Sequence, residues 1–190
     1  MRTLVVIVGL FAIVSFSGPS KSPAPRQKSP AISAATPLIL EKDQGEERTW
    51  RPLELPPEGT SDFMLKVDSR NGNSQHLVMG VEDLEAGGVI DMHKHLAQDE
   101  IVYLQNGTAH VSLGGIERDV HGDATVFIPE GTWISFKNIG AEPIHLVYVF
   151  SHPGFDTYMR CASVPYGQPA LALTPQEDKA CQAKGHVMYK

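Results

Sequence analysis

Short runs of alternating apolar and polar residues make up most of the chain after residue 60 and predict β-strands. Successive side chains of a strand point to opposite faces, so a strand with one buried face shows this alternation. The runs are rich in β-branched or aromatic residues and are separated by turn residues such as Asn71-Gly72 and Gly114-Gly115. They span residues 63–67, 74–81, 89–95, 100–105, 109–113, 116–120, 125–128, 133–137 and 144–150. Many short strands at this spacing predict an all-β fold, an antiparallel β-barrel or jelly roll.

One short helix is predicted near the C-terminus, over residues 174–184. Thr174 is a suitable N-cap, Pro175 fits the first helical position, and Glu177 completes a capping box with Thr174. Gly185 is expected to end the helix, because glycine readily adopts the left-handed conformation found at helix ends. This helix should carry Cys181.

The first 18 residues are similar to a secretory signal peptide. Met1 and Arg2 form a basic start, residues 3–16 form an apolar run, and residues 15–18 form a small-residue region suited to cleavage. The apolar run is shorter than the roughly 20 residues that a membrane-spanning helix needs, so no membrane association is expected after processing. The protein is therefore expected to be exported, either to the periplasm or out of the cell.

The rest of the chain divides into three parts. Residues 19–38 are rich in Pro, Ser, Lys and Ala and are predicted to be a disordered tether. Residues 39–155 are predicted to form the barrel, and residues 156–190 a C-terminal extension with the helix. A folded part of about 150 residues is large enough for one well-buried core. No internal repeat is present in the sequence, which favours a single barrel.

The charge of the chain excludes some partners. Its formal net charge is −6, and no cluster of Lys and Arg follows residue 30. Nucleic acids and anionic membranes bind through such clusters, so neither is expected as a partner. The sequence leaves the oligomeric state open, with a homodimer among the alternatives.

Two cysteines, Cys161 and Cys181, are the only ones in the sequence, and both lie in the C-terminal extension. An even number of cysteines in an exported chain favours a disulfide. Closing a loop of this length could add about 3 kcal/mol to stability. The alternative is a pair of free thiols.

Three residues with metal-binding side chains are spaced so that they can converge. His93 and His95 are two positions apart on a predicted strand, so both imidazoles lie on the same face. After a short connection, Glu100 begins the next predicted strand. Two imidazoles and one carboxylate can bind a divalent transition metal at about 2.0–2.2 Å and leave coordination positions open.

The residues around these three strengthen the interpretation. Gly87 precedes His93 by six positions, and Gly107 follows Glu100 by seven. This spacing resembles the first motif of the cupin superfamily at every fixed position, and residues 122–138 resemble its second motif. The resemblance implies a single cupin barrel with His93, His95 and Glu100 as metal ligands.

The second motif differs from the family at Ile134, where the family usually has a third histidine ligand. Isoleucine cannot bind a metal, so the fourth position is left empty, taken by water, or supplied from elsewhere. His145, on the predicted strand 144–150, is the best-placed substitute in the sequence. Its strand register is not fixed by the sequence, and the favoured alternative is a solvated residue on the outer face.

Strand parity suggests what surrounds the metal. If His93 and His95 face inward, Val89 and Asp91 do so too, and Asp91 becomes a candidate general base. The alternative is a solvated carboxylate at the barrel mouth. An apolar wall is expected from Val102, Leu104, Ile134 and Phe136, as suits a small organic ligand.

Two functions follow from these residues. The first is a metal-dependent enzyme, of the dioxygenase or the isomerase/lyase type, that uses Fe, Mn, Ni or Zn to act on a small organic molecule. The second is a secreted protein that binds a small ligand without chemistry, its metal site being degenerate at Ile134. The intact trio and Asp91 favour the enzyme, and Ile134 favours the binding protein.

Overall fold

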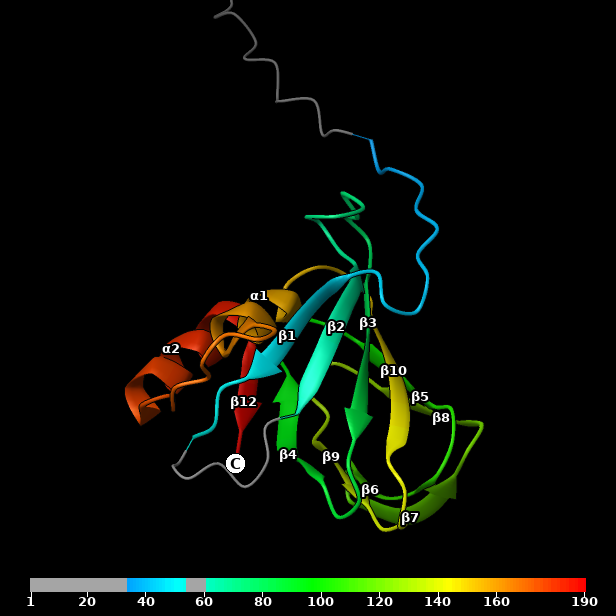
Figure 1. The fold of residues 1–190 in the computed structure, drawn as a ribbon. Helices are drawn as coiled ribbons and strands as arrows, with labels where there is room; N and C mark the ends of the chain where they lie inside the picture. Colours follow the sequence, from blue (N-terminus) through cyan, green and yellow to red (C-terminus); the bar gives the residue numbers. More distant parts are fainter. Residues whose placement is uncertain (1–33, 54–60) are drawn as a thin grey trace, which may run out of the picture. The chain divides into compact units, whose positions relative to one another are not determined.

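The computed structural model describes residues 34–53 and 61–190, and its strands form two antiparallel sheets (Figure 1). The larger sheet has the strand order β11-β1-β2-β3-β10-β5-β8, and the smaller has the order β12-β4-β9-β6-β7. Strands of the larger sheet are β1 (Glu46–Trp50), β2 (Asp62–Val67), β3 (Val78–Leu84), β5 (Glu100–Leu104), β8 (Ala124–Ile128), β10 (Ile144–Phe150) and β11 (Ser163–Pro165). Strands of the smaller sheet are β4 (Val89–His95), β6 (Thr108–Leu113), β7 (Ile116–His121), β9 (Ile134–Asn138) and β12 (Val187–Tyr189).

The fold is the predicted jelly roll, although the two sheets are not closed into a barrel by strand pairing within the described residues. Inward-facing side chains of both sheets form one core between them. On β10, buried and half-buried residues alternate along the whole strand, as expected for a strand with one face against a core. Full burial of a large aliphatic side chain contributes about 1.5–3 kcal/mol. The largest fully buried aliphatic residues are Leu65, Leu104, Ile128, Ile134, Ile144 and Leu146.

Most strands lie where the sequence predicts them, and 89–95 and 144–150 have the predicted bounds. The prediction for 74–81 is wrong, since β3 begins only at Val78. Its pairing with β10 extends to Leu84, opposite Ile144. The Ser74 hydroxyl donates to the Leu77 carbonyl and accepts from the Leu77 amide, so this segment forms a turn.

The predicted signal peptide and residues 19–33 of the predicted tether lie outside the described residues. Within the described part of the chain, no helix is long and apolar enough to cross a membrane.

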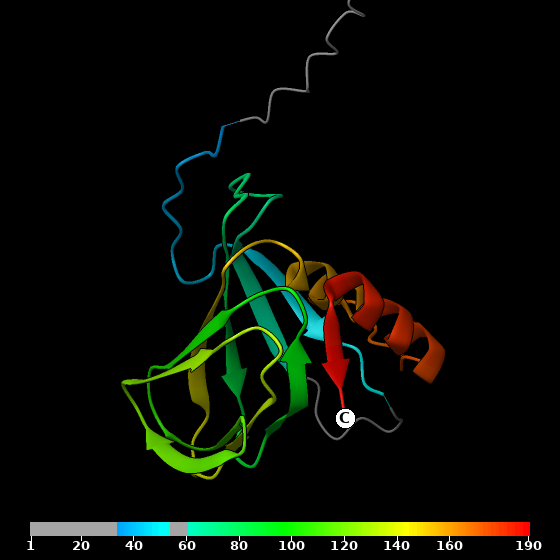
Figure 2. The same cartoon turned by 180° about the vertical axis from the view of Figure 1, so that it is seen from behind.

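The C-terminal extension adds a strand to each sheet and two helices, α1 (Phe155–Cys161) and α2 (Pro175–Gly185). Thr174 and Glu177 form the predicted capping box of α2. Cys161 and Cys181 are joined by a disulfide, which links α1 to α2. Figure 2 shows the red β12 beside the green β4, with which it pairs.

The predicted role of Gly185 is wrong. Gly185 is the last residue of α2, and His186 adopts the left-handed conformation instead. A Cβ at Gly185 would collide with Tyr158 of α1. Glycine is therefore required here because the two helices pack closely.

An ion-pair network holds α1 against the larger sheet. Arg160 of α1 pairs with Glu46 at 2.6 Å, with Asp156 at 2.7 Å, and with the buried Asp68. Burial by itself would raise the pKa of the Asp68 carboxyl, but hydrogen bonds from Arg160 and from two backbone amides hold that pKa below its usual value. Burial by itself would also raise the pKa of Glu46, but its hydrogen bonds and ion pairs with Arg160 and Arg48 hold that pKa below its usual value.

Candidate metal centre

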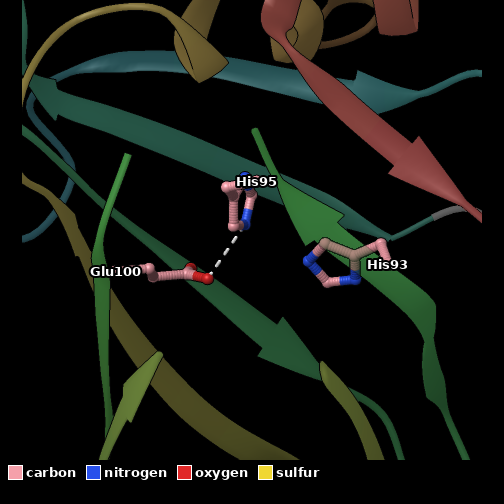
Figure 3. A group of neighbouring side chains, drawn as sticks. All are labelled: His93, His95 and Glu100. Atoms are coloured by element: carbon pink, nitrogen blue, oxygen red, sulfur yellow. Dashed lines mark hydrogen bonds and ion pairs between the residues drawn. The ribbon is translucent and has the colours of Figure 1, made fainter. Parts of the chain in front are cut away.

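His93, His95 and Glu100 come together between the two sheets (Figure 3). The histidines lie at the end of β4 in the smaller sheet, and Glu100 begins β5 in the larger sheet. All three are buried, with exposed fractions of 5%, 1% and 7%. Their candidate ligand atoms lie within 4.8 Å of one another. The short connection between β4 and β5 therefore brings the predicted trio together.

Hydrogen bonds orient the two imidazoles. His93 Nδ1 lies 2.7 Å from the backbone carbonyl oxygen of Asp91, which can only accept. His93 therefore carries its proton on Nδ1 and has a free lone pair on Nε2. His95 Nε2 lies 3.0 Å from Glu100 Oε2. Burial, and next the neighbouring His95, lower the pKa of His93 and favour the neutral form that a metal requires.

These donors fit a divalent transition metal. His95 is enclosed by aromatic rings, with ring centroids at 4.4 Å from Phe155 and 5.0 Å from Phe150. Its buried Nδ1 has no hydrogen-bond partner among the described residues. Two imidazole nitrogens and one carboxylate oxygen on a buried wall can hold such an ion and leave coordination positions open.

A β-bulge in β4 changes the parity predicted for Val89. Ile90 pairs with Phe136 and His93 pairs with Ile134, so β4 has one extra residue between these pairs. Ile90 packs against the core in place of Val89, which is 53% exposed. The prediction that Val89 faces inward with the histidines is therefore wrong.

Asp91 lies within the bulge and lines the edge of the cavity with an exposed side chain. Its carbonyl group orients His93. The bulge thus separates two roles that the sequence could not distinguish, because the backbone of Asp91 positions a ligand while its carboxylate reaches solvent. Its role as a general base stays a prediction.

Ile134 is fully buried and lies opposite His93 in the strand register. Of the four residues predicted to form the apolar wall, Val102 and Phe136 line the cavity, whereas Leu104 and Ile134 belong to the core. His145 lies on the outer face of β10, where Nδ1 is 2.5 Å from Asp83 Oδ1. It is therefore not a fourth ligand.

A cavity of about 920 Å³ opens beside the trio. This volume is in the usual range for sites that bind small molecules. Residues of both sheets line it, among them His93, Glu100, Val102 and Phe136, and helices α1 and α2 and strand β12 supply further lining residues.

Sequence reasoning missed the part of the site that the C-terminal extension supplies. The ring of Tyr189 on β12 stacks on His93, with 5.2 Å between centroids. Tyr189 also packs against Tyr158 of α1, with 5.8 Å between ring centroids. A three-residue strand has no distinctive sequence pattern, so only the apolar and aromatic residues after Gly185 could have suggested it.

Glu82 on β3 is another acidic residue of the cavity, and the sequence analysis missed it. Its Oε1 accepts hydrogen bonds from Trp50 Nε1 and Ser61 Oγ, each at 3.1 Å. Burial raises the pKa of the Glu82 carboxyl to about 7, helped by the charges of Glu100 and Asp83 and opposed by the two hydrogen bonds.

Comparison with known proteins agrees with this architecture. Residues 80–150 match the model of the cupin domain. The uncharacterized protein YrkC of Bacillus subtilis is 23% identical over 119 residues, which are 54% of this chain and 64% of that protein. The chain thus spans less than two thirds of that relative's length.

Among solved structures, a predicted oxalate decarboxylase from Thermotoga maritima is similar with a TM-score of 0.52 and 15% identity. The match covers 61% of this chain and all of that one, and it concerns the fold alone. KdgF from Halomonas sp. matches with a TM-score of 0.44 and 16% identity, over 55% of this chain and 86% of that one. The matched segment holds the strands that carry His93, His95 and Glu100, so this part of the chain is a cupin domain.

Proposed function

We propose that this protein is an exported, metal-dependent enzyme that acts on a small organic molecule by dioxygenase or isomerase/lyase chemistry. The observation that carries the proposal is the convergence of His93, His95 and Glu100 beside a cavity large enough for such a molecule, which His93 and Glu100 line. A divalent transition metal such as Fe, Mn, Ni or Zn would supply Lewis acidity or a site for dioxygen.

Residues of the chain supply the rest of the environment. Aromatic rings on both sides of the trio keep water from His95 and give the cavity an apolar surface. Asp91, at the edge of the cavity, is proposed as a general base that reaches the substrate from the solvent side. The similar Thermotoga structure is a predicted oxalate decarboxylase, so oxalate belongs in the substrate panel.

Export is supported by the apolar N-terminal run and by the Cys161–Cys181 disulfide, because disulfides persist in oxidising compartments. The net charge of −6 supports a small molecule over nucleic acid as the ligand. Cell fractionation of the full-length chain, with mass analysis of its N-terminus, tests the first point. An uncleaved chain in the cytoplasm would contradict it.

The alternative is a secreted binding protein without catalysis. Ile134 favours it, because this buried isoleucine stands beside His93 where the family usually places a third histidine. Three-ligand sites are common in catalytic metal centres, since an open position admits substrate, so three protein ligands also suit the enzyme.

The test compares metal content and turnover in matched variants. His93→Ala/His95→Ala should lose the metal that the wild type retains after purification without a tag. His110→Ala/His121→Ala, which removes two histidines of the smaller sheet outside the cavity, should retain it. Oxygen uptake and product formation are then measured with phenolic, keto-acid and oxalate substrates. Unchanged metal content in the first variant would refute the site.

Ile134→His separates the two functions. In an enzyme with three protein ligands, the new imidazole should tighten metal binding and lower turnover, because it occupies a position that the substrate needs. In a degenerate binding protein, it should create metal affinity that the wild type lacks at micromolar concentration and cost no function. The second result would replace the enzyme with the binding protein.

A further inference from the structure

Three polar side chains lie on adjacent strands of the larger sheet and line the cavity. Glu82 on β3 is opposite Leu146 of β10, Tyr148 on β10 is opposite Gly80 of β3, and Glu100 on β5 is opposite Phe150 of β10. All three line the cavity that includes His93. Glu82 and Tyr148 therefore belong to the same cavity as the trio without being part of it.

One carboxylate oxygen of Glu82 accepts hydrogen bonds from the protein, and the other is free to bind a ligand. Trp50 and Ser61 both donate to Oε1. Within the described residues, no hydrogen bond involves Oε2 and no cation bonds to the carboxylate. Glu82 is half-buried in the cavity wall, and a carboxylate there with one unused oxygen lacks the partners that its charge requires. A ligand that donates a hydrogen bond would provide one.

The hydroxyl of Tyr148 also lacks a partner. It is buried, and no described residue hydrogen-bonds to it. Gly80 makes room for this hydroxyl, because a Cβ at position 80 would collide with it. An unsatisfied buried hydroxyl costs stability, so its retention in a closely fitted position points to a ligand oxygen as the missing partner.

The charges around this pair favour a hydrogen-bond donor over an anion. The charges of Glu100 on β5 and of Asp83, the next residue of β3, both raise the pKa of Glu82, and Tyr148 on β10 lies two positions from the residue opposite Glu82. The cationic residues of the cavity are directed elsewhere. Arg51 donates to the carbonyl groups of Leu171 and Ala172, Lys179 is exposed, and Lys190 lies over the Trp133 ring. A hydroxyl group suits this wall, whereas a carboxylate or phosphate would be repelled.

We propose that Glu82 and Tyr148 form a hydroxyl-binding site, and that the substrate is a hydroxyl-bearing organic compound with an apolar or aromatic frame. The proposal rests on the proposed function and deepens it by naming the substrate class. Trp50, Phe136, Phe150, Phe155, Tyr158 and Tyr189 give the cavity the aromatic lining that such a frame requires.

The chemical step is a proton transfer. The substrate O–H bond breaks, and its proton forms a new O–H bond with Oε2 of Glu82. The electron pair stays on the substrate oxygen, to which the Tyr148 hydroxyl donates a hydrogen bond. Glu82 later returns the proton to product or solvent, so the step requires no other reactant.

The test is calorimetric titration of the purified full-length protein with catechol, with the metal content of each sample measured. Catechol stays neutral below about pH 8, because phenolic hydroxyls ionise near pH 10. Any change in affinity near neutral pH therefore belongs to the protein. For the wild type, affinity should rise about tenfold between pH 6 and pH 8, as Glu82 ionises with its pKa of about 7.

Three variants make the test specific. Glu82→Gln keeps the oxygen that accepts from Trp50 and Ser61 but cannot ionise, so its affinity should be low and independent of pH. Glu85→Gln, an exposed position further along the chain, should behave as the wild type does. Tyr148→Phe should bind catechol about two- to tenfold more weakly and keep the pH dependence.

Thermal stability distinguishes a binding role of Tyr148 from a purely structural one. Because its hydroxyl is unsatisfied without a ligand, Tyr148→Phe should be more stable to heat than the wild type while binding less catechol. Unchanged affinity in this variant would remove Tyr148 from the site.

The outcomes separate this inference from the metal site. Equal pH dependence in the wild type and Glu82→Gln, or no catechol binding at about 10 mM by a sample with full metal content, would overturn the hydroxyl site and leave the metal site standing. Samples that never hold metal give the converse result. If catechol affinity then loses its pH dependence only in Glu82→Gln, the hydroxyl site is supported while the metal-dependent function fails.

Discussion

Opposing effects act on the ionisable side chains inside this protein, and the balance between them differs from one side chain to the next. Burial favours the neutral form of His93, which leaves its imidazole ready to bind a metal. Burial also raises the pKa of Glu82, and no cation among the described residues compensates for it. Arg160, in contrast, keeps the carboxylate of Asp68 ionised although it is buried. Burial therefore accompanies three different roles, those of a candidate metal ligand, a proton acceptor and a structural ion pair.

Glu82→Gln should change how stability depends on pH. The pKa of Glu82 is raised from 4.5 to about 7 in the folded state, so between these values the folded chain holds a proton that the unfolded chain has lost. Glu82 thus contributes stability that is fully present below pH 4.5 and is lost as the pH rises through about 7. Glutamine stays neutral, so the variant should equal the wild type near pH 5 and be more stable at about pH 8.

Urea denaturation of both proteins at the two pH values measures this difference. Glu85→Gln serves as the control and should follow the wild type. A variant less stable than the wild type at the higher pH would show that the Glu82 carboxylate has a stabilising partner.

Among the secondary-structure elements, β4 determines the site because it is paired on both sides. Strand β9 pairs with it across the bulge, and β12 covers its other edge, with Val187 opposite His95 and Tyr189 opposite His93. Helix α2 leads directly into β12. The disulfide joins α2 to α1, so it also fixes the element that places Tyr189 on His93.

Cys161→Ser/Cys181→Ser should lower the free energy of unfolding by about 2–4 kcal/mol, because the unfolded chain regains the freedom of a loop closed across 20 positions. Guanidinium denaturation with and without reductant measures the loss. Reductant should destabilise the wild type and leave the double variant unchanged. Equal stability of both proteins without reductant would mean that the bond contributes nothing to folding.

At the scale of the whole molecule, the C-terminal extension belongs to the cupin fold rather than following it. Strand β11 pairs with β1, β12 pairs with β4, and the Arg160 network fastens α1 to the larger sheet. The matched cupin segment, residues 80–150, therefore supplies the trio, and residues after it complete the lining of the cavity.

This network predicts acid sensitivity. The pKa values of Glu46 and Asp68 are depressed in the folded state, so their contribution to stability is present above their unfolded values near pH 4 and is lost as the pH falls further. Arg160→Met should cost about 3–5 kcal/mol at neutral pH, because it leaves Asp68 and Asp156 buried without their partner.

Thermal unfolding from neutral pH down to about pH 3 checks both effects. The wild type should lose stability steeply below about pH 4, and Arg160→Met should lose less over the same interval because its carboxylates are no longer depressed. Parallel curves for the two proteins would contradict the assignment of acid sensitivity to this network.

Much of the fold and the trio could be predicted from the sequence, because these features depend on local spacing. Alternation and turn residues placed most strands, the capping box placed α2, and the two-residue spacing of His93 and His95 put both imidazoles on one face. Local backbone geometry decides each of these features, and a short segment of sequence contains it.

Tertiary structure alone decided the remainder. The bulge in β4 depends on pairing with β9, and because of it Ile90 rather than Val89 packs against the core. Strand β12 is too short to show a pattern, and Glu82 and Tyr148 became neighbours only through the pairing of β3 with β10. In each case the partner lies many positions away in the chain. Alternation within one strand gives a face, but which residues share a cavity depends on register between strands, which non-local packing sets.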